Sequence, residues 1–554
     1  MKSSHLPIQS LAIAGLGVLL AGSAVAQTTL YEFTGAASND RLGAGLAAAG
    51  DLNGDGVTEL LVGVPQDGNA FTAGNGLLEL RDGATGSVLT SWSGLGFADA
   101  FGTAVDGGED VDGDGVPDIV VGSPFYSGSG ITGAGLTTVL SGASYSVLGQ
   151  VPGGSTQENI GLTVKLTGDL DGDGLSEIMT GSLDAFSNRG VVRVYTLAGG
   201  GLSLMYEWVG ANGGSRFGIS FDTISDINSD GVVDLLIGSA FRGYYIYSGA
   251  DGTELRNTTL ASESTLGTSV CSIPDLNGDG IDEIVTGAIQ AGVFNPGPGR
   301  VYVRSGLTDT TLFTIDGATA GDRFGWKVAD AGDWNGDGKN DFLVTSDPNT
   351  GVGFVTLHSG DGGAVLSTFT GDSASDQIGE AITSLGDLDG DNKVEIMIGS
   401  PGATTGLIRQ GMARIYSSPF EGCGGIVSYC GNATANSGGS PATIAVIGST
   451  SVSDGTLILQ ASSVVANGFG LFYYGPDRIN QTVGNGIRCV GGSTLRLAPT
   501  QATGTQVLKS LFTDPNSASI TGNATLNFQY WYRDIPAGGA GFNFSDALEI
   551  RFCN

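Results

Sequence analysis

Apolar and polar positions follow one another along this chain in short runs that suit β-strands and show no helical period. Runs such as Glu59–Gly63 and Asp118–Gly122 are almost wholly apolar and fit buried strands. A following segment such as Leu77–Arg81 predicts a third strand, and V-L-x-x-x-x-G segments such as Val88–Gly94 predict a fourth. The set recurs about every 55 residues. Four short strands per period predict the blade of a β-propeller.

An acidic nine-residue pattern, D-x-[D/N]-x-D-G-x-x-[D/E], marks every period. Its seven copies lie 49 to 59 residues apart and begin at Asp51, Asp110, Asp169, Asp226, Asp275, Asp333 and Asp387. Eight residues before each first Asp lies a glycine that follows an apolar residue, as in Leu42-Gly43, and twelve residues after it lies Gly or Thr. This 21-residue block contains no insertion in any copy. All length variation therefore falls outside it, as expected for surface loops around a core.

The two ends of the repeat region predict how the ring closes. The last block is followed by a third strand, Met412–Ser417, but by no fourth strand, whereas a fourth-type strand, Thr29–Gly35, precedes the first block. Pairing these two segments would complete the last blade and protect its edge. We therefore predict an all-β protein with a seven-bladed propeller over 28–418.

The fourth copy, Arg216–Ala240, contains R-F-G, then D-x-N-x-D-G-x-x-D, then G-S-A, and resembles the FG-GAP repeat. The whole repeat region resembles the propeller of integrin α subunits and their bacterial relatives. The resemblance implies calcium in the acidic loops and a ligand on the opposite face. It does not name the ligand, because one fold carries many binding functions.

The acidic loops themselves predict up to seven Ca²⁺ sites. Carboxylate or amide oxygens at positions 1, 3, 5 and 9 converge in a tight loop, and hard oxygen ligands in a flexible cage suit Ca²⁺ better than Mg²⁺. Glycine at position 6 permits the sharp turn, and the seventh loop has Asn392 there. The predicted ligands are Asp51, Asn53, Asp55, Glu59, Asp110, Asp112, Asp114, Asp118, Asp169, Asp171, Asp173, Glu177, Asp226, Asn228, Asp230, Asp234, Asp275, Asn277, Asp279, Glu283, Asp333, Asn335, Asp337, Asp341, Asp387, Asp389, Asp391 and Glu395.

Two alternatives compete with this interpretation. An EF-hand-like loop requires an acid at position 12 and a following helix. Position 12 is apolar or Thr here, and a strand is expected next: Val62, Val121, Thr180, Ile237, Thr286, Val344 and Ile398. The loops could also be turns without metal, since Asp, Asn and Gly favour turns. However, the predicted ligand positions hold 24 of the 56 acids, and packing three or four carboxylates together without a cation is unfavourable.

The face opposite the acidic loops is the predicted ligand face. It is formed by the loops of variable length between strands two and three and between blades. These loops carry Phe71, Phe125, Tyr126, Phe186, Arg189, Phe241, Arg242, Phe294 and Arg409. The alternative for each aromatic residue is that it covers the end of its own blade.

No catalytic residue is predicted. His358 is the one histidine after the N-terminal segment, and it falls in a third-strand pattern. The sequence has neither a His/Cys zinc cluster nor a nucleotide fingerprint in its required context. Paired carboxylates for glycoside chemistry have candidates among many spare acids, but nothing singles out a pair. An extracellular polysaccharide-degrading enzyme on a propeller therefore remains an alternative.

Residues 1–26 have the features of a secretory signal peptide. Lys2 precedes an apolar stretch, Leu11–Leu20, and Ala24-Val25-Ala26 forms a small-x-small cleavage pattern before Gln27. The alternative, a membrane anchor, needs about 20 apolar residues. We expect an exported monomer that is secreted, extracellular or at the cell surface, with the periplasm also open. No transmembrane segment is expected after removal of the signal.

Net charge narrows the range of partners. The formal charge is −33, from 56 acidic and 23 basic residues, and nucleic-acid binding requires a basic surface. Calcium would neutralise part of this charge, but nucleic acid is still not expected. An extracellular protein or a glycan fits better.

Residues 421–554 lack the repeat and form the predicted C-terminal domain. Cys423, Cys430, Cys489 and Cys553 predict two disulfides with three possible connectivities, while Cys271 lies within the propeller. Strand-like segments separated by turn residues predict a β-sandwich-like domain: Thr456–Gln460, Gly470–Tyr474, Leu495–Leu497, Leu526–Tyr532 and Ala547–Phe552. The aromatic segment 528–532 is expected in the core, with a sugar-stacking platform as the alternative.

Together these features favour a secreted or surface propeller with structural calcium that recognises a protein or glycan in an adhesion-type role. The alternatives are the enzyme named above and a structural envelope protein.

Overall fold

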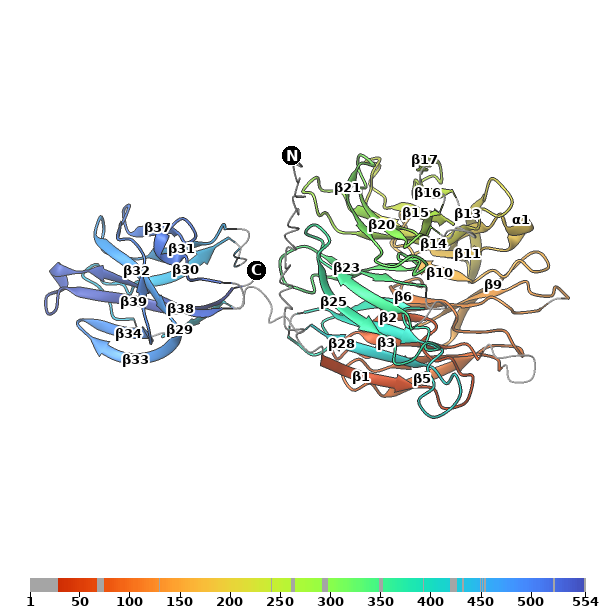
Figure 1. Ribbon diagram of the computed structural model, residues 1–554, viewed down its shortest axis with the longest axis horizontal. Helices are drawn as coiled ribbons and strands as arrows, with labels where there is room; N and C mark the ends of the chain where they lie inside the picture. The colour runs from red at the N-terminus through yellow and green to blue at the C-terminus, as the bar shows by residue number, and fades with distance from the viewer. Residues whose placement is uncertain are drawn as a thin grey trace, which may run out of the picture.

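In the computed structural model, most of the chain folds into two groups of β-sheets (Figure 1). The described residues are 28–66, 74–128, 130–240, 242–260, 265–290, 297–347, 352–391, 393–418, 426–430, 433–448, 450, 452, 455–521 and 524–552, without the side chains of 186, 426, 427 and 537. The predicted signal peptide and the predicted disulfide residues Cys423 and Cys553 lie outside them.

Seven four-stranded antiparallel sheets form the propeller, as predicted. In blades one to six the strands follow chain order, so each blade is a meander. Blades one to three comprise β2 (Leu46–Gly50), β3 (Glu59–Val64), β4 (Leu77–Arg81), β5 (Val88–Ser93); β6 (Val105–Glu109), β7 (Asp118–Ser123), β8 (Leu136–Leu140), β9 (Val147–Pro152); and β10 (Thr163–Leu166), β11 (Ile178–Ser182), β12 (Val191–Ala198), β13 (Gly201–Val209).

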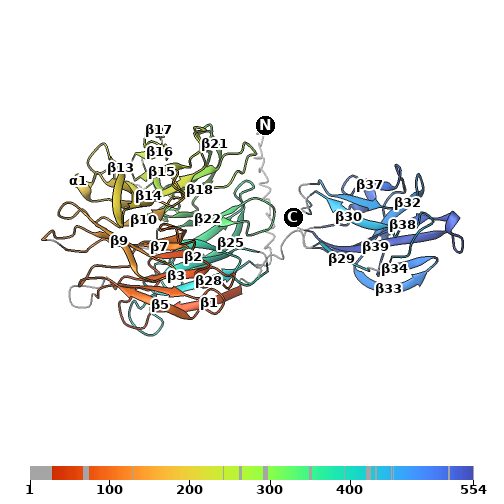
Figure 2. The same ribbon diagram turned by 180° about the vertical axis from the view of Figure 1, so that it is seen from behind.

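Blades four to six have the same plan. They comprise β14 (Phe217–Ile224), β15 (Asp234–Ser239), β16 (Gly243–Tyr247), β17 (Glu254–Thr258); β18 (Leu266–Ile273), β19 (Glu283–Ala288), β20 (Arg300–Ser305), β21 (Thr311–Asp316); and β22 (Val328–Gly332), β23 (Asp341–Thr345), β24 (Phe354–His358), β25 (Val365–Thr370). One short helix, α1 (Ala185–Asn188), lies between β11 and β12 and is visible at the outer edge of the propeller in Figure 2.

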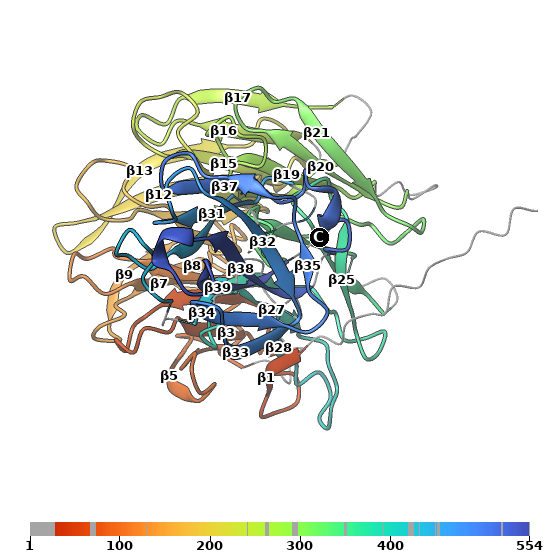
Figure 3. The ribbon, with the colours of Figure 1, turned by 90° about the vertical axis from the view of Figure 1, so that its left-hand side faces the viewer.

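The seventh blade joins the two ends of the repeat region, as the sequence predicts. It contains β26 (Ile382–Gly386), β27 (Glu395–Ser400) and β28 (Met412–Ser417), and its fourth strand is β1 (Thr28–Thr34). β1 pairs antiparallel with β28, with Thr34 opposite Met412 and Thr28 opposite Ser417. Red β1 lies beside cyan β28 in Figure 3, where the blades follow one another around the ring. Closure gives β28 a partner on its outer side.

Burial falls from the middle of each blade outward. The second strand is buried along its whole length in every blade, as in β3 and β27, because neighbouring strands and neighbouring blades cover both faces. The fourth strand, for example β5, is mostly exposed. Hydrophobic clusters connect adjacent blades, as where Leu61 of β3 packs with Ile119 of β7.

Two glycines of the repeated block meet where one blade contacts the next. A Cβ on Gly122 of β7 would lie 1.9 Å from the carbonyl oxygen of Gly161, and a Cβ on Gly63 would lie 2.0 Å from that of Gly102. These separations leave no space for a side chain. The invariant spacing of the block therefore reflects backbone-to-backbone packing between successive blades.

The C-terminal domain is all-β, and its sheets lie in three layers. The central sheet holds β29 (Ile426–Tyr429), β39 (Phe542–Arg551), β38 (Thr525–Arg533), β32 (Phe469–Gly475), β35 (Leu495–Arg496) and β36 (Thr500–Gln501). The outer layers are a three-stranded sheet, β30 (Thr443–Ile447), β31 (Ile458–Ser462) and β37 (Gln506–Ser510), and a hairpin, β33 (Asp477–Val483) and β34 (Gly486–Gly491). Two short 3-10 turns, η1 (Pro515–Ser517) and η2 (Ile535–Ala537), complete the described elements.

The hairpin adds a third layer to the two layers of a simple β-sandwich. The reason is that side chains alternate between the two faces of the central sheet. In β38, Phe528, Tyr530 and Tyr532 point into the main core against the three-stranded sheet. Trp531 points the other way and joins a second cluster beneath the hairpin. Both faces of the central sheet are apolar, so both require cover. The aromatic segment expected in the core is therefore divided between two hydrophobic clusters, and Trp531 is only partly buried.

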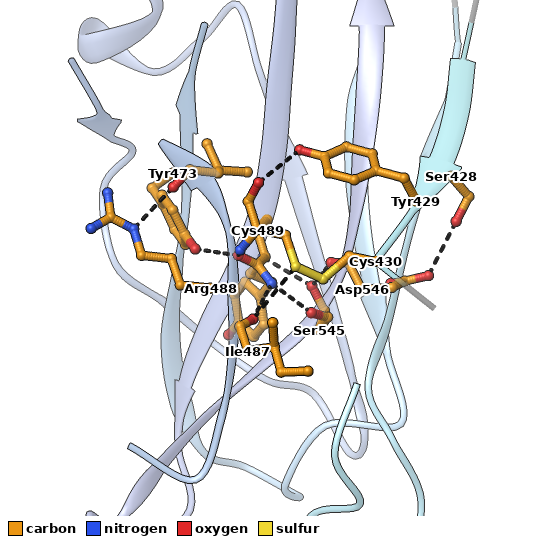
Figure 4. Close-up of a disulfide and its surroundings, with 12 residues drawn as sticks. Ser428, Tyr429, Cys430, Tyr473, Ile487, Arg488, Cys489, Ser545 and Asp546 are labelled. Atoms are coloured by element: carbon orange, nitrogen blue, oxygen red, sulfur yellow. Dashed lines mark hydrogen bonds between the residues drawn. A yellow bond between two sulfur atoms is a disulfide. The ribbon is translucent and has the colours of Figure 1, made fainter. Parts of the chain in front are cut away.

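A disulfide joins Cys430, next to β29, to Cys489 of β34, with a Cα–Cα distance of 6.2 Å (Figure 4). One of the three possible connectivities contains this pair. Tyr429 Oη also donates to the carbonyl oxygen of Cys489 at 3.2 Å. The hairpin is thereby tethered to the central sheet. Cys271 is buried in β18 as a free thiol, and burial raises its pKa.

Candidate metal loops and axial pocket

Each acidic loop connects the first and second strands of its blade. In blade one, β2 ends at Gly50 and β3 begins at Glu59, so the loop's ninth position is the first residue of the second strand. No helix follows any of the seven loops within the described residues. This local order is the predicted one and differs from that of an EF-hand.

The loop folds around its first carboxylate. Asp51 Oδ1 accepts from the backbone N–H of Gly54 at 2.7 Å, and Oδ2 accepts from that of Gly56 at 2.8 Å. Both glycines have positive φ, 79° and 88°. The same pair of bonds recurs in the loops that begin with Asp110, Asp169 and Asp275. Glycine is favoured because the turn takes the left-handed conformation twice, and Ser229 takes the first of these positions in loop four with a φ of 64°.

The ninth position carries a carboxylate that is fully buried in all seven loops. One oxygen accepts a backbone N–H from the start of its own loop, as in Leu170 N–H to Glu177 Oε2 at 2.6 Å. The other oxygens of Glu177 and Glu395 are buried and make no hydrogen bond of normal geometry in the described part of the chain. A buried carboxylate oxygen without a partner is costly, and a cation would satisfy it.

Burial raises the pKa of these ninth-position acids, partly offset by the backbone N–H bond and increased by neighbouring carboxylates. The pKa reaches about 6 for Asp118 and Asp234, about 7 for Glu177, Glu283 and Glu395, and about 8 for Asp341, and it is also raised for Glu59. A bound cation would favour the ionised form of each group.

Five of the seven loops bring three carboxylates within 4.8 Å of one another. These sets are Asp51, Asp55 and Glu59; Asp110, Asp112 and Asp118; Asp169, Asp171 and Asp173; Asp275, Asp279 and Glu283; and Asp387, Asp389 and Glu395. In loops four and six, Asn228 and Asn335 donate through their amide to Asp230 at 2.7 Å and to Asp337 at 2.9 Å. Turning each amide over would present its oxygen to a cation.

The donor set fits a hard divalent cation. In five loops it consists of three carboxylate oxygens, and in four of these the buried ninth-position carboxylate is one of the three. The acidic clusters of these five loops are therefore compatible with Ca²⁺. Asn392 lies outside the described residues.

On the opposite face, a pocket of about 380 Å³ opens on the propeller axis. We call it the axial pocket. The residue that follows the repeated glycine contributes to its wall in every blade: Ala44, Thr103, Leu162, Ile219, Thr268, Trp326 and Glu380. Five of these residues precede the first strand of their blade, and Ile219 and Thr268 lie near the start of β14 and β18; the first strands lie side by side around the ring. Equivalent positions of seven repeats thus converge on one hollow.

The charges in the axial pocket differ from those of the whole protein. Arg41, Arg216 and Lys327 line it, against one carboxylate, Glu380, among the described residues. Arg41 donates to Gln377 Oε1 at 3.3 Å. The side chains of Arg216 and Lys327 make no hydrogen bond or ion pair with any described residue. Two cations are therefore available to a ligand.

The predicted ligand-face residues only partly form this pocket. Phe125 lines it and is 48% exposed. Tyr126, Arg189, Arg242 and Arg409 lie outside it, and Arg189 donates to the carbonyl oxygen of Gly210. The described structure does not include Phe71, Phe241 and Phe294, or the side chain of Phe186. Sequence reasoning missed Trp326 and Lys327, although their place after the repeated Phe-Gly pair was a usable signal.

Half-buried charges also lie within the ring, on the first strands. Lys165 pairs with Asp222 at 3.0 Å, and Asp106 accepts from the backbone N–H of Leu166 at 2.9 Å. Burial raises the pKa of Asp106, while Lys165 opposes that shift. These contacts link blades two, three and four.

His358 lies in β24 and is 1% exposed. Its Nε2 is 2.8 Å from Thr356 Oγ1, its Nδ1 is 3.0 Å from the carbonyl oxygen of Gly363, and its ring stacks on Phe342. Burial lowers its pKa. These contacts are those of a core histidine.

A closed ring of seven four-stranded blades, with acidic loops on one face and a hollow on the other, defines a seven-bladed β-propeller, and comparisons with known proteins identify the type of repeat. The FG-GAP repeat model matches residues 42–78, 101–140 and 266–303. Integrin alpha pat-2 of Caenorhabditis briggsae is 44% identical over 88 residues, covering 15% of this chain and 7% of that protein.

Two vertebrate relatives match longer segments. Integrin alpha-V of Gallus gallus is 26% identical over 205 residues, and integrin alpha-8 of Mus musculus is 30% identical over 211 residues; each match covers 35% of this chain and 19% of the relative. This chain thus contains three segments that match the FG-GAP repeat, and part of it is similar to integrin α subunits. It spans a fifth or less of the length of these relatives.

Among the described residues, no helix has the length and apolar character needed to cross a bilayer.

Proposed function

We propose that this protein is an exported, calcium-stabilised propeller that binds a protein or glycan ligand at the axial pocket, in an adhesion-type role. The observation that carries the proposal is the convergence of one equivalent residue from every blade on a single hollow. Its volume of about 380 Å³ falls in the usual range for ligand sites. The similarity to integrin α subunits supports an adhesion-type role.

The wall of the axial pocket combines apolar surface with charge. Trp326 and Phe125 offer aromatic surface, while Arg216 and Lys327 offer donors without a partner in the described structure. Such an arrangement favours a ligand with an apolar body and an acceptor or anionic group. Glu380 supplies one acid, which leaves the hydrolase alternative without a second carboxylate in the described lining, and we do not propose it.

Calcium has a structural role in this proposal. The acidic loops lie on the face opposite the pocket, so cations there would fix the ends of the first strands. The other ends of those strands carry the pocket residues. Removing calcium should therefore weaken ligand binding indirectly, by loosening the ring.

A ligand array tests the proposal. The purified chain is applied to immobilised matrix proteins and glycans, with calcium and with chelator, as wild type and as Lys327→Ala. Loss of a charge-assisted contact costs about 1.5–3 kcal/mol, or roughly 10- to 100-fold in affinity. Arg242→Ala is the matched control, because Arg242 is exposed but does not line the pocket. Failure to bind any ligand in calcium, or equal loss in both variants, would refute the axial site.

Export is tested separately. Edman sequencing of the protein collected from culture medium should begin at Gln27. Retention of residues 1–26 on a membrane-bound protein would contradict it.

A further inference from the structure

A second cavity, of about 420 Å³, lies in the C-terminal domain, beside the β33–β34 hairpin. Strands of the central sheet supply Leu471, Tyr473, Trp531, Phe542 and Phe544, the hairpin supplies Val483 and Arg488, and Thr494 and Arg496 complete the wall. We propose that this cavity binds an acidic oligosaccharide, with a sugar ring on Trp531 and a uronic-acid carboxylate held by Arg488 and Arg496.

The aromatic floor supplies the stacking surface. Trp531 points away from the main core, because Tyr530 and Tyr532 on either side of it are buried there. Phe542 packs beside Trp531, with ring centroids 5.8 Å apart. The indole N–H of Trp531 makes no hydrogen bond to any described residue. The C–H face of a pyranose packs on such an aromatic ring. The hydroxyl and ring oxygens of the sugar can accept a hydrogen bond from the indole N–H.

The charged side chains of the cavity wall favour a negatively charged ligand. Both are arginines, and no described carboxylate lines the cavity. Arg488 donates through Nε to the carbonyl oxygen of Val490 at 2.9 Å and through Nη2 to Thr494 Oγ1 at 3.4 Å, which fixes its position beside Tyr473 (Figure 4) and leaves the protons on Nη1 for a ligand. Arg496 is exposed, and its guanidinium makes no hydrogen bond or ion pair with a described residue. A guanidinium binds a carboxylate through two parallel hydrogen bonds.

The surroundings hold this arrangement in place. Arg488 neighbours Cys489 along β34, so the disulfide to Cys430 anchors the strand that carries the arginine. The overall charge of −33 repels anions at long range, so attraction of an acidic ligand must come from these local cations. A short acidic glycan fits this requirement better than a highly charged polymer.

The test is calorimetric titration of the full chain, loaded with calcium, with trigalacturonic acid. Maltotriose is the neutral control of equal length. We expect binding of the acidic sugar that weakens with added salt, and binding of maltotriose at least 10-fold weaker. Arg496→Ala should weaken acid binding roughly 10- to 100-fold, the equivalent of one charge-assisted pair. Trp531→Phe should weaken it less than Trp531→Ala does.

Arg533→Ala is the matched control, because Arg533 is exposed on β38 and does not line the cavity. Unchanged melting temperatures would show that the variants fold. Lys327→Ala should leave this binding intact, which separates it from the axial site. Equal affinity for the two sugars, binding that survives both Arg496→Ala and Trp531→Ala, or binding of a glutamate-rich peptide in place of sugar would overturn the proposal.

Discussion

Replacing Glu177 by Gln should have effects of opposite sign with and without calcium. Glu177 is fully buried, and its Oε2 accepts from the backbone N–H of Leu170 at 2.6 Å. The oxygen of Gln can keep that bond. The amide nitrogen would replace the other oxygen, which accepts no hydrogen bond of normal geometry from a described residue. A nitrogen that carries two protons cannot ligate a cation, so this substitution removes a metal ligand while it preserves shape.

In calcium the variant should be less stable than the wild type. One site contributes about 2.7 kcal/mol when free calcium is 100-fold above its dissociation constant. Unfolding entropy of about 2.1 cal/mol/K per residue, summed over about 390 residues, converts this into a loss of about 3 °C in Tm.

In chelator at pH 8 the order should reverse. Burial raises the pKa of Glu177 to about 7, above its unfolded value, so ionisation penalises the folded state as pH rises. Because solvent screens part of the effect, we expect the variant to gain about 1 kcal/mol at pH 8. The gain should disappear below about pH 4.5, where the carboxyl is protonated in both states.

Differential scanning calorimetry with calcium and with chelator, at pH 8 and pH 4.5, measures the change in stability of the variant relative to the wild type in each condition. Glu158→Gln is the control: Glu158 is 1% exposed and pairs with Arg193, outside any acidic loop. It should destabilise the protein in both conditions. A wild-type Tm that chelator does not move, or a Glu177→Gln effect of the same sign in both conditions, would refute the calcium interpretation.

Three further predictions concern packing, pH and the disulfide. Gly122→Ala should cost more than about 3 kcal/mol in chemical denaturation, because its Cβ would lie 1.9 Å from a backbone oxygen, whereas Gly201→Ala, with no atom within 4 Å, should change stability by less than about 1 kcal/mol. Burial lowers the pKa of His358, so its contribution is present above the unfolded pKa of about 6.5 and is lost as pH falls; unfolding from pH 7.5 to 5.5 should show a steeper decline in wild type than in His358→Gln, and parallel curves would contradict this. Replacing Cys430 and Cys489 by Ala removes a disulfide that spans 59 residues and should lower the unfolding free energy of the C-terminal domain by about 4 kcal/mol. The calcium-dependent unfolding transition of the propeller should stay unchanged. A shift of both unfolding transitions would contradict this prediction.

Local pattern accounts for what could be predicted. A block of fixed length predicts the seven blades and the acidic loops, because each loop is a local turn between two strands. The fourth-type strand before the first block predicts how the ring closes. Gly54 and Gly56 mark that turn in the sequence, because few residues other than glycine adopt its positive-φ backbone conformation. The buried ninth acid was likewise visible, as the first residue of an apolar run.

Contacts between distant residues account for the rest. Trp326 and Lys327 gain their place in a pocket only when seven repeats are arranged around one axis, which no single repeat specifies. In the C-terminal domain, the sequence marked an aromatic strand. Which face carries Trp531, and which hairpin covers it, depended on pairing between segments far apart in the chain. Sequence by itself determined the repeated strands and their acidic loops, because those depend on neighbours along the chain. Tertiary structure alone decided the two pockets, because their walls come from residues that only folding brings together.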